Sequence, residues 1–152
     1  AFLDQYAERC ARLDDVLYGF FVDGVLRGAG ELRRLSSPQG GRFAEAAFSV
    51  ERPWRRLGVG RELMARIVRA ARNRRAQTLY MSCLSRNAAM QSLAREFSAE
   101  MRFEPGEAFS LLAVETPTAF SMLYEALDDG AGFATAMLDL QRRRLSARGA
   151  TN

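Results

Sequence analysis

A strand-like segment that runs through a glycine-rich turn into a helix limits most strongly how this chain can fold. Residues 42–51 (RFAEAAFSVE) predict a strand that Pro53 ends, and an amphipathic helix is expected over residues 59–74. Glycine costs about 1 kcal/mol relative to alanine inside a helix. Gly58 and Gly60 at a helix start therefore indicate that bare backbone is needed there.

The turn RRLGVG (55–60) has the properties of an anion site. The first amides of a helix are unpaired and lie at the positive end of the helix dipole. Gly58 and Gly60 let a phosphate approach the backbone, and Arg55 and Arg56 can add charge from the rim. We expect a diphosphate here, although an ordinary strand-to-helix turn with solvated arginines fits the spacing equally well. The run is neither a Walker loop, which needs a lysine, nor a Rossmann fingerprint, which needs a third glycine.

The order of the elements predicts one α+β domain. Residues 16–22 and 25–35 form a hairpin around Asp23-Gly24, because Asp-Gly suits a tight primed turn. The other predicted elements are helices over 2–13, 59–74 and 87–101, strands over 42–51, 78–84 and 109–115, and a helical segment from 116 to about 145, broken or kinked at 128–132. Strand 78–84 is nearly all apolar, as expected of a strand buried on both sides. The result is a mixed, mostly antiparallel sheet with helices on both faces.

Residues 116–147 are predicted as a helical extension of a core over residues 1–115, within a single domain of 152 residues. Thr116 and Pro117 make a good helix start, as an N-cap followed by proline. The apolar face of the extension consists of Phe120, Leu123, Tyr124, Leu127, Phe133, Met137 and Leu140. That face either packs onto the same domain or forms a homodimer interface.

The composition excludes several kinds of chemistry. The chain contains no histidine, and all 22 of its basic residues are arginine. It therefore lacks a Ser-His or Cys-His dyad, a histidine metal site and a Schiff-base lysine, and we expect no bound metal. Acid–base chemistry is left to carboxylates, tyrosine, cysteine or water.

Charge, hydropathy and cysteine content favour a cytoplasmic protein that binds neither nucleic acid nor membrane. The arginines are spread along the chain among 18 acidic residues, without a single aromatic-laced patch. No apolar stretch approaches the ~20 residues that span a bilayer, and the N-terminus lacks a signal pattern. Cys10 and Cys83 are expected as buried free thiols in a reducing compartment, with a disulfide or a nucleophile as the alternatives.

The stretch FAEAAFSVERPWRRLGVGRELM (43–64) resembles the acetyl-CoA-binding core of the GNAT superfamily of N-acetyltransferases. The family's hallmark is Arg/Gln-x-x-Gly-x-Gly/Ala after a strand, and Arg55, Gly58 and Gly60 match it. The likeness continues through TLYMSCL and SRNAAMQSLAREF, where Asn87 stands at the family's usual asparagine. It covers residues 16 to about 104.

Two features of the sequence depart from this family. The usual first strand is not evident before residue 16, which is consistent with a missing N-terminal segment. Many members end with a β-hairpin, whereas here the predicted strand 109–115 is followed by a long helical segment.

The resemblance implies acetyl-CoA as cofactor and direct transfer of its acetyl group to a deprotonated amine. Strands 43–51 and 78–84 would splay apart, and the pantetheine arm would lie in the gap, bonded to backbone around Phe48, Ser49 and Val50. A backbone N–H near Val50 would stabilise the oxyanion. Asn87 would face the cofactor from the exit of the opposite strand. The diphosphate would rest on Arg55, Arg56, Leu57, Gly58, Val59, Gly60 and Arg61.

Glu45 is the candidate general base. It stands among apolar residues in FAEAAF, and such surroundings should raise the pKa of a carboxylate to suit a base near neutral pH. The same FAE-x-AF pattern carries the general-base glutamate in some protein-acetylating GNAT members. Alternatively, Glu45 is half exposed or pairs with an arginine such as Arg34. Glu51 is the second candidate for the base.

The general acid is less clearly marked in the sequence. The resemblance implies a tyrosine about two turns into the helix after Asn87, where this chain has Ala94 with Leu93 beside it. Tyr80 and Tyr124 are the nearest substitutes, and both are more typical of core residues. Water, or no dedicated acid, is the alternative.

These features together favour an acetyltransferase that moves an acetyl group from acetyl-CoA to a primary amine. The acceptor could be a polyamine, an amino acid, an antibiotic or a protein lysine. The missing tyrosine favours a second interpretation, a non-catalytic acyl-CoA-binding or sensor domain on the same fold. A nucleic-acid-binding module, suggested by the arginine content, is the third.

Overall fold

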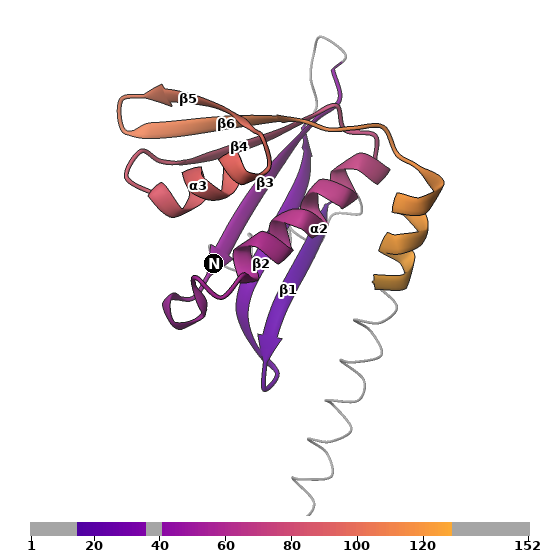
Figure 1. Ribbon diagram of the computed structural model, residues 1–152, viewed down its shortest axis with the longest axis horizontal. Helices are drawn as coiled ribbons and strands as arrows, with labels where there is room; N and C mark the ends of the chain where they lie inside the picture. The colour runs from indigo at the N-terminus through magenta and orange to yellow at the C-terminus, as the bar shows by residue number, and fades with distance from the viewer. Residues whose placement is uncertain (1–14, 36–40, 129–152) are drawn as a thin grey trace, which may run out of the picture.

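The structure, a computed structural model, describes residues 15–35 and 41–128. Six strands form one sheet in the order β1-β2-β3-β4-β6-β5 (Figure 1). Its elements are β1 (Val16–Val22), β2 (Val25–Leu35), β3 (Phe43–Val50), a 3-10 turn (Arg52–Trp54), α2 (Val59–Asn73), β4 (Thr78–Leu84), α3 (Ala88–Glu96), β5 (Glu100–Glu104) and β6 (Glu107–Ala113). All neighbouring strands are antiparallel except β3 and β4. The mixed α+β sheet expected from the sequence is confirmed.

The hairpin of β1 and β2 turns at Asp23 and Gly24, as predicted. Both residues have left-handed backbone, with φ of 49° and 68°. Two consecutive positive φ angles are the requirement of a type I′ turn, which Asp-Gly meets with little strain.

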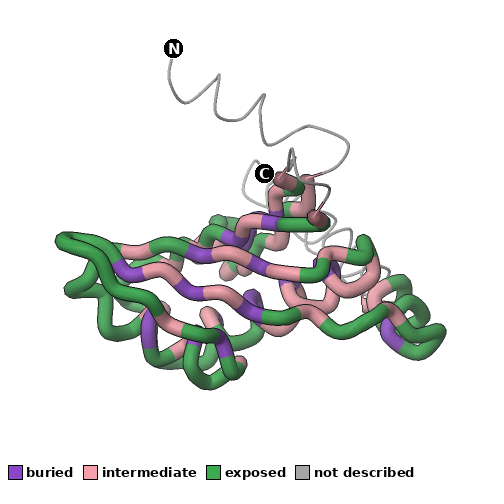
Figure 2. Tube along the Cα trace, turned by 90° about the horizontal axis from the view of Figure 1, so that it is seen from above, coloured by how far each residue is buried: buried purple, intermediate pink, exposed green. Residues whose placement is uncertain are grey.

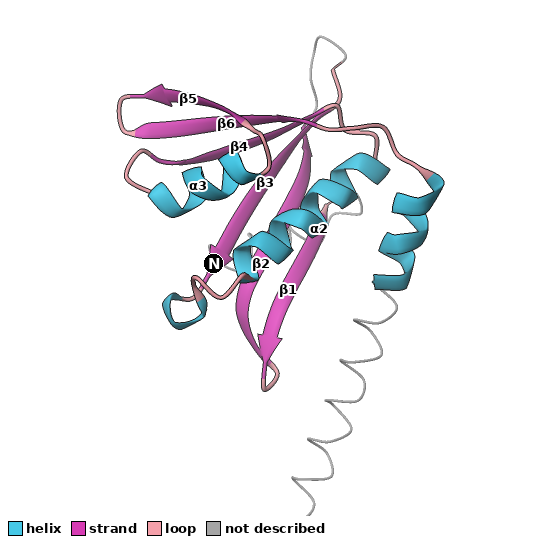
Figure 3. Ribbon diagram, in the orientation of Figure 1, coloured by secondary structure: helices cyan, strands magenta, loops and turns pink. Residues whose placement is uncertain are grey.

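Helix α2 covers one face of β1, β2 and β3 (Figure 3). Its buried side is apolar and consists of Val59, Leu63, Met64, Ile67, Ala70 and Ala71. The helix lies close to the sheet, because a Cβ placed on Gly30 would come within 3.3 Å of Ile67 and Phe48. On the outer side, Arg66 and Glu62 form an i,i+4 ion pair at 2.9 Å.

Helix α3 lies on the same face of the sheet as α2, since its Ala94 shares one core cluster with Met81 and Leu112. Buried positions alternate along the strands (Figure 2). Strand β4 is thus buried on one face, and the expectation of burial on both faces was wrong. The helix predicted over 2–13, with Cys10, lies outside the described residues.

The segment after Asn87 differs most from its prediction. The helix expected to reach residue 101 ends at Glu96, and Ser98 has a left-handed φ of 62°. Residues 100–104 then form β5, a strand missing from the prediction, which turns at Gly106 (φ 89°) into β6. The fold therefore does contain a terminal β-hairpin. Its sequence signal is Pro105-Gly106, since proline followed by glycine suits a tight turn.

The C-terminal extension is helical over residues 119–128. Its N-cap is Thr118 rather than the predicted Thr116, because the Thr118 hydroxyl accepts a hydrogen bond from the Ser121 amide at 3.0 Å. The predicted break at 128–132 and the helix beyond it lie outside the described residues. None of the helices that the structure describes is both long and apolar enough to cross a membrane.

Candidate active site

Strands β3 and β4 run parallel and separate partway along their length. Their pairing consists of Phe43 with Thr78, Ala44 with Leu79 and Glu45 with Tyr80, after which the two strands diverge (Figure 1). β3 stays paired with β2, and β4 stays paired with β6, along the whole divergent part. The splay predicted for these two strands is confirmed, and it begins directly after Glu45.

The edge of β3 that lines this gap carries backbone groups that pair with no strand of the described chain, although the Val50 carbonyl accepts a hydrogen bond from the Arg55 side chain. The Glu51 amide donates to the Arg27 carbonyl of β2 at 2.9 Å, which fixes the direction of each peptide group along β3. Successive residues of a strand direct their N–H and C=O groups to opposite sides. Ser49 accordingly faces β2 rather than the gap. The residues that face the gap are Ala46, Phe48 and Val50.

The bend between β3 and α2 exposes its amides. Arg56 (φ 64°) and Gly58 (φ 86°) both have left-handed backbone, and Gly58 is the N-cap of α2. In the described part of the chain, no carbonyl accepts a hydrogen bond from the amides of residues 57–61, and no side chain caps the helix. The amides at this helix start therefore remain available to an anion.

The charge around the bend is positive. The carboxylates on its two sides are neutralised, since Glu51 pairs with Arg27 at 3.0 Å and Glu62 pairs with Arg66. The Arg55 Nε donates to the Val50 carbonyl at 2.8 Å, which holds this guanidinium at the mouth of the gap. Among the described residues, no acidic partner lies within ion-pair distance of Arg55 or Arg56.

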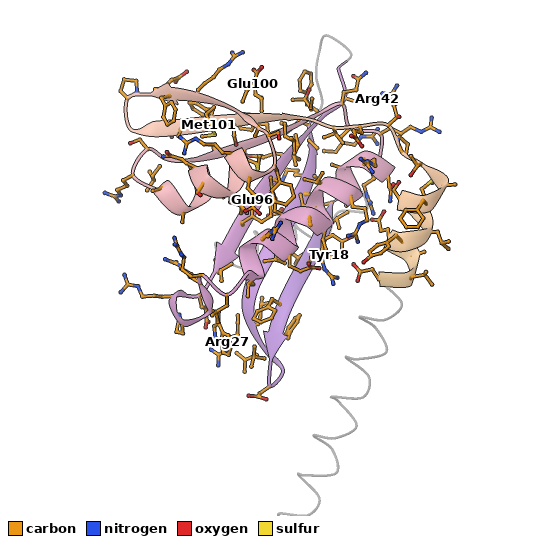
Figure 4. The ribbon with its side chains drawn as sticks, in the orientation of Figure 1. Tyr18, Arg27, Arg42, Glu96, Glu100 and Met101 are labelled. Carbon is orange, nitrogen blue, oxygen red and sulfur yellow. The ribbon has the colours of Figure 1, made fainter. Side chains whose placement is uncertain are left out.

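Beyond the bend, the N-terminal end of α2 lies close to the C-terminal half of α3. A Cβ placed on Gly60 would lie 3.7 Å from Leu93 of α3, so this glycine faces the second helix. The Arg61 Nε pairs with the Glu96 carboxylate at 2.7 Å, and Figure 4 shows Glu96 between the two helices. The Arg61 side chain thus links the helices, and only its amide belongs to the bend.

Glu45 lies at the apex of the gap, in the last residue pair before the strands diverge. Its neighbours Ala44 and Ala46 are buried beneath the helices, so the Glu45 side chain lies on the opposite face of the sheet. There it is half-buried.

The strand partners of Glu45 on that face are Arg33 and Tyr80. Arg33 is already paired with the buried carboxylate of Glu31 at 2.9 Å, and this hydrogen bond raises the pKa of the guanidinium. Within the described chain, the Glu45 carboxylate forms no hydrogen bond or ion pair, including the pair with Arg34 considered from the sequence. Glu45 is therefore a half-buried carboxylate that lies beside the gap without a partner among these residues.

Comparison with known families identifies this arrangement. The sequence model of the acetyltransferase (GNAT) family matches residues 2–98, more than half of the chain. The chain belongs to the GNAT acetyltransferase family. No curated protein sequence matches it significantly.

Solved structures share the GNAT fold at low sequence identity. The ribosomal-protein-alanine N-acetyltransferase of Brucella melitensis has a TM-score of 0.65 at 22% identity, with 74% of this chain and 76% of that chain covered. The putative acetyltransferase yncA of Salmonella typhimurium, determined with acetyl-CoA, has a TM-score of 0.64 at 19% identity, with 76% of this chain and 73% of that chain covered. The N-acetyltransferase of Staphylococcus aureus Mu50 has a TM-score of 0.63 at 19% identity, with 74% of this chain and 75% of that chain covered.

GNAT proteins use acetyl-CoA, and the residues present in this chain fit that cofactor. The open edge of β3 offers donors and acceptors to an extended amide-bearing chain such as pantetheine. The edge leads to the bend, where the uncapped amides and the guanidiniums of Arg55 and Arg56, which have no acidic partner in residues 15–35 and 41–128, suit a diphosphate. Among the described residues, no group of three potential metal ligands occurs.

Asn87 has a structural role that is independent of any cofactor. It is the N-cap of α3, and its Oδ1 accepts a hydrogen bond from the Met90 amide at 3.2 Å. The side-chain NH₂ group has no partner among the described residues, so it alone is available to the cofactor.

We expect Asn87→Ala to lower the free energy of unfolding by about 1 kcal/mol, because the helix loses its cap. Asn87→Ser keeps a capping oxygen and should restore most of that stability in thermal or urea unfolding. If the Asn87 amide also holds the cofactor, the Ser variant will still bind coenzyme A more weakly than the wild type. Unchanged affinity in the Ser variant would limit Asn87 to capping.

The two candidate tyrosine acids lie in different places. Tyr124 stacks on the Arg69 guanidinium, 4.3 Å from the ring centroid, and Arg69 lies about 15 Å along α2 from the glycine bend at 1.5 Å per residue. Tyr80 lies beside Glu45 and stacks on Phe109 at 5.9 Å. Burial raises the pKa of the Tyr80 phenol, and the Glu45 carboxylate adds to the rise, so this group keeps its proton near neutral pH. Of the two, only Tyr80 is close to the gap.

Proposed function

We propose that this GNAT protein transfers an acetyl group from acetyl-CoA to a primary amine of a small molecule or a protein lysine. The observation that supports this most directly is the position of Glu45, a carboxylate without a partner in the described ranges, at the apex of a strand gap whose open edge leads into uncapped helix amides. Acetyl-CoA supplies an activated acetyl thioester, and the chain must position it, bring in the amine and remove a proton.

The proposed cofactor contacts follow the course of β3 and the bend. The gap-facing groups of Phe48 and Val50 would hold the pantetheine arm, and one of these amides would donate to the carbonyl oxygen as negative charge develops on it. Ala46, which the sequence reasoning missed, joins them on the same edge. The amides of residues 57–61 would hold the diphosphate, with Arg55 and Arg56 at its rim.

Glu45 is the proposed general base. The carboxylate would accept the proton of the incoming ammonium, which leaves the nitrogen lone pair free to attack the thioester carbonyl. Because its side chain lies on the sheet face opposite α2 and α3, the amine would approach from that face. Tyr80, on the same face, is the proposed donor of a proton to the departing thiolate, with water as the alternative.

Release of free coenzyme A thiol over a panel of amines tests this function. The panel should include a polyamine, free amino acids, an aminoglycoside, a lysine peptide and a peptide with N-terminal alanine, since one similar structure is named a ribosomal-protein-alanine N-acetyltransferase. We expect thiol release above the hydrolysis rate with at least one amine, and a matching acetylated product by mass spectrometry.

A non-catalytic acyl-CoA sensor is the second candidate, because α3 carries no tyrosine. The same assay separates the two functions when it is paired with thermal unfolding. Coenzyme A at 100 times its dissociation constant should stabilise either protein by about 2.7 kcal/mol. Stabilisation without turnover on any amine would favour the sensor.

We also propose a cytoplasmic location. Cys83 is a free, half-buried thiol, and burial raises its pKa, which keeps it protonated and unreactive. Such thiols are typical of a reducing compartment.

A further inference from the structure

The helix over residues 119–128 contacts the rest of the chain through its polar side. The Asp128 carboxylate pairs with Arg66 at 3.0 Å and with Arg69 at 3.1 Å. Glu125 pairs with Arg74 at 2.8 Å and accepts a hydrogen bond from the Tyr18 hydroxyl at 3.3 Å. These contacts hold the helix against the arginine-rich outer side of α2, and Figure 4 shows Tyr18 beside it.

The same contact contains a neutral hydrogen-bond network. The Ser121 hydroxyl donates to the Asn73 Oδ1 at 2.6 Å, and the Asn73 amide donates to the Ser121 carbonyl at 3.0 Å and to Glu125. Ser121 is buried, and Glu125 and Asp128 are half-buried. Residues spaced by three or four share one helix face, so 121, 125 and 128 form the inner face of this helix.

The outer face of the helix is apolar and exposed to solvent. Its large side chains and their exposed fractions are Phe120 (75%), Leu123 (59%), Tyr124 (49%) and Leu127 (64%). Their arrangement reverses the usual one, in which the apolar face of a surface helix is buried and its charges are in water. The polar side chains of Ser121, Glu125 and Asp128 point toward α2 and not toward water.

We infer that this apolar face, residues 120, 123, 124 and 127, is a homodimer interface that pairs with the same face of a second copy of the chain. Four large side chains that are about half or more exposed leave on the order of 500 Å² of apolar surface in water. Two copies would bury about 1,000 Å² in total, which is the lower bound for a specific protein–protein interface.

A second copy is the partner whose chemistry fits best. The face carries no charge and, apart from the Tyr124 hydroxyl, no hydrogen-bonding group, so a charged or polar partner would lose its own hydration without compensation. Two-fold symmetry places the face against itself, which matches apolar surface with apolar surface. An antiparallel pair of these helices also opposes their dipoles. The inference concerns a surface away from the gap and does not depend on acetyl transfer.

Sedimentation equilibrium of the full chain tests the inference. The wild type should sediment at twice the 17.0 kDa chain mass in the micromolar range. Leu123→Glu places a carboxylate in the interface twice, once from each copy, and should weaken dimerisation at least about 100-fold. Leu26→Glu is the matched control, because Leu26 is a leucine with 46% exposure at the β1–β2 hairpin, and this variant should remain dimeric.

A thermal shift with coenzyme A shows in each variant that the domain is folded. A wild type that stays monomeric up to 100 μM would overturn the inference, and would indicate that residues 129–152 of the same chain, or another protein, cover the face. A dimer that Leu123→Glu and Leu127→Glu leave intact would overturn it as well, because the interface would then lie elsewhere.

Discussion

Glu45→Gln is expected to lower kcat at least about 100-fold at pH 7, because removal of a general base typically costs a factor of 10² to 10⁴. Glutamine has nearly the same shape as glutamate and cannot accept the proton of the incoming ammonium. At alkaline pH more of the amine is already deprotonated, so the variant should recover part of its rate. The pH–rate profile should therefore move toward higher pH, while the affinity for coenzyme A stays unchanged.

Glu51→Gln is the control for this prediction. Glu51, the second candidate for the base, directly follows β3 at its far end from Glu45, and the structure shows it exposed and paired with Arg27 at 3.0 Å. Its substitution should leave the pH–rate profile in place. If Glu45→Gln gave the wild-type profile, or if Glu51→Gln gave the shifted one, the assignment of the base to Glu45 would be wrong.

Gly58→Val is expected to weaken the binding of coenzyme A at least about 100-fold. Gly58 has a φ of 86°, and a Cβ built there meets no atom within 4 Å, so a valine would stand in the open space above the uncapped amides. The diphosphate would lose two or more hydrogen bonds from these amides, at about 1.5–3 kcal/mol each for a charged acceptor. Calorimetric titration with coenzyme A measures the loss directly.

Gly106→Val separates this effect from backbone strain. Gly106 has nearly the same φ, 89°, and its Cβ would also meet nothing within 4 Å, but it lies at the turn between β5 and β6. Both variants should lose about 1–2 kcal/mol of stability, since a side chain is strained in the left-handed region. Only Gly58→Val should change the affinity for coenzyme A. Equal affinities in the two variants would remove the bend from the cofactor site.

The bend was predicted from local signals in the sequence, whereas the gap between β3 and β4 was implied by the family resemblance. Gly58 has to be glycine for its backbone angle, and Pro53 ends β3 at the predicted place. Which amides of β3 face the gap was not predictable, because it depends on the register with β2. One hydrogen bond, from the Glu51 amide to the Arg27 carbonyl, decides that Ala46 faces the gap and that Ser49 does not.

The hairpin of β5 and β6 was missed because the apolar residues that lead into it have the spacing of an amphipathic helix. Phe97 and Met101 continue the spacing of Met90 and Leu93, so periodicity alone extends α3 across the strand. The chain instead turns at Ser98 and returns at Gly106. In this case the Pro105-Gly106 turn carried more information than the apolar period.

The C-terminal helix shows a different limit of pattern analysis. Periodicity correctly groups Phe120, Leu123, Tyr124 and Leu127 on one side, but it does not give the direction in which that side points. The direction is set by the arginines of α2, which need acidic partners and find them in Glu125 and Asp128. Charge pairing with another element therefore overrides the usual burial of an apolar face.

A crystal structure of the chain with coenzyme A would locate the cofactor directly. We expect diphosphate oxygens within hydrogen-bonding distance of the amides of residues 57–61, and the pantetheine arm between β3 and β4 along Ala46, Phe48 and Val50. Coenzyme A bound elsewhere, with the bend empty and the edge of β3 unoccupied, would contradict this expectation.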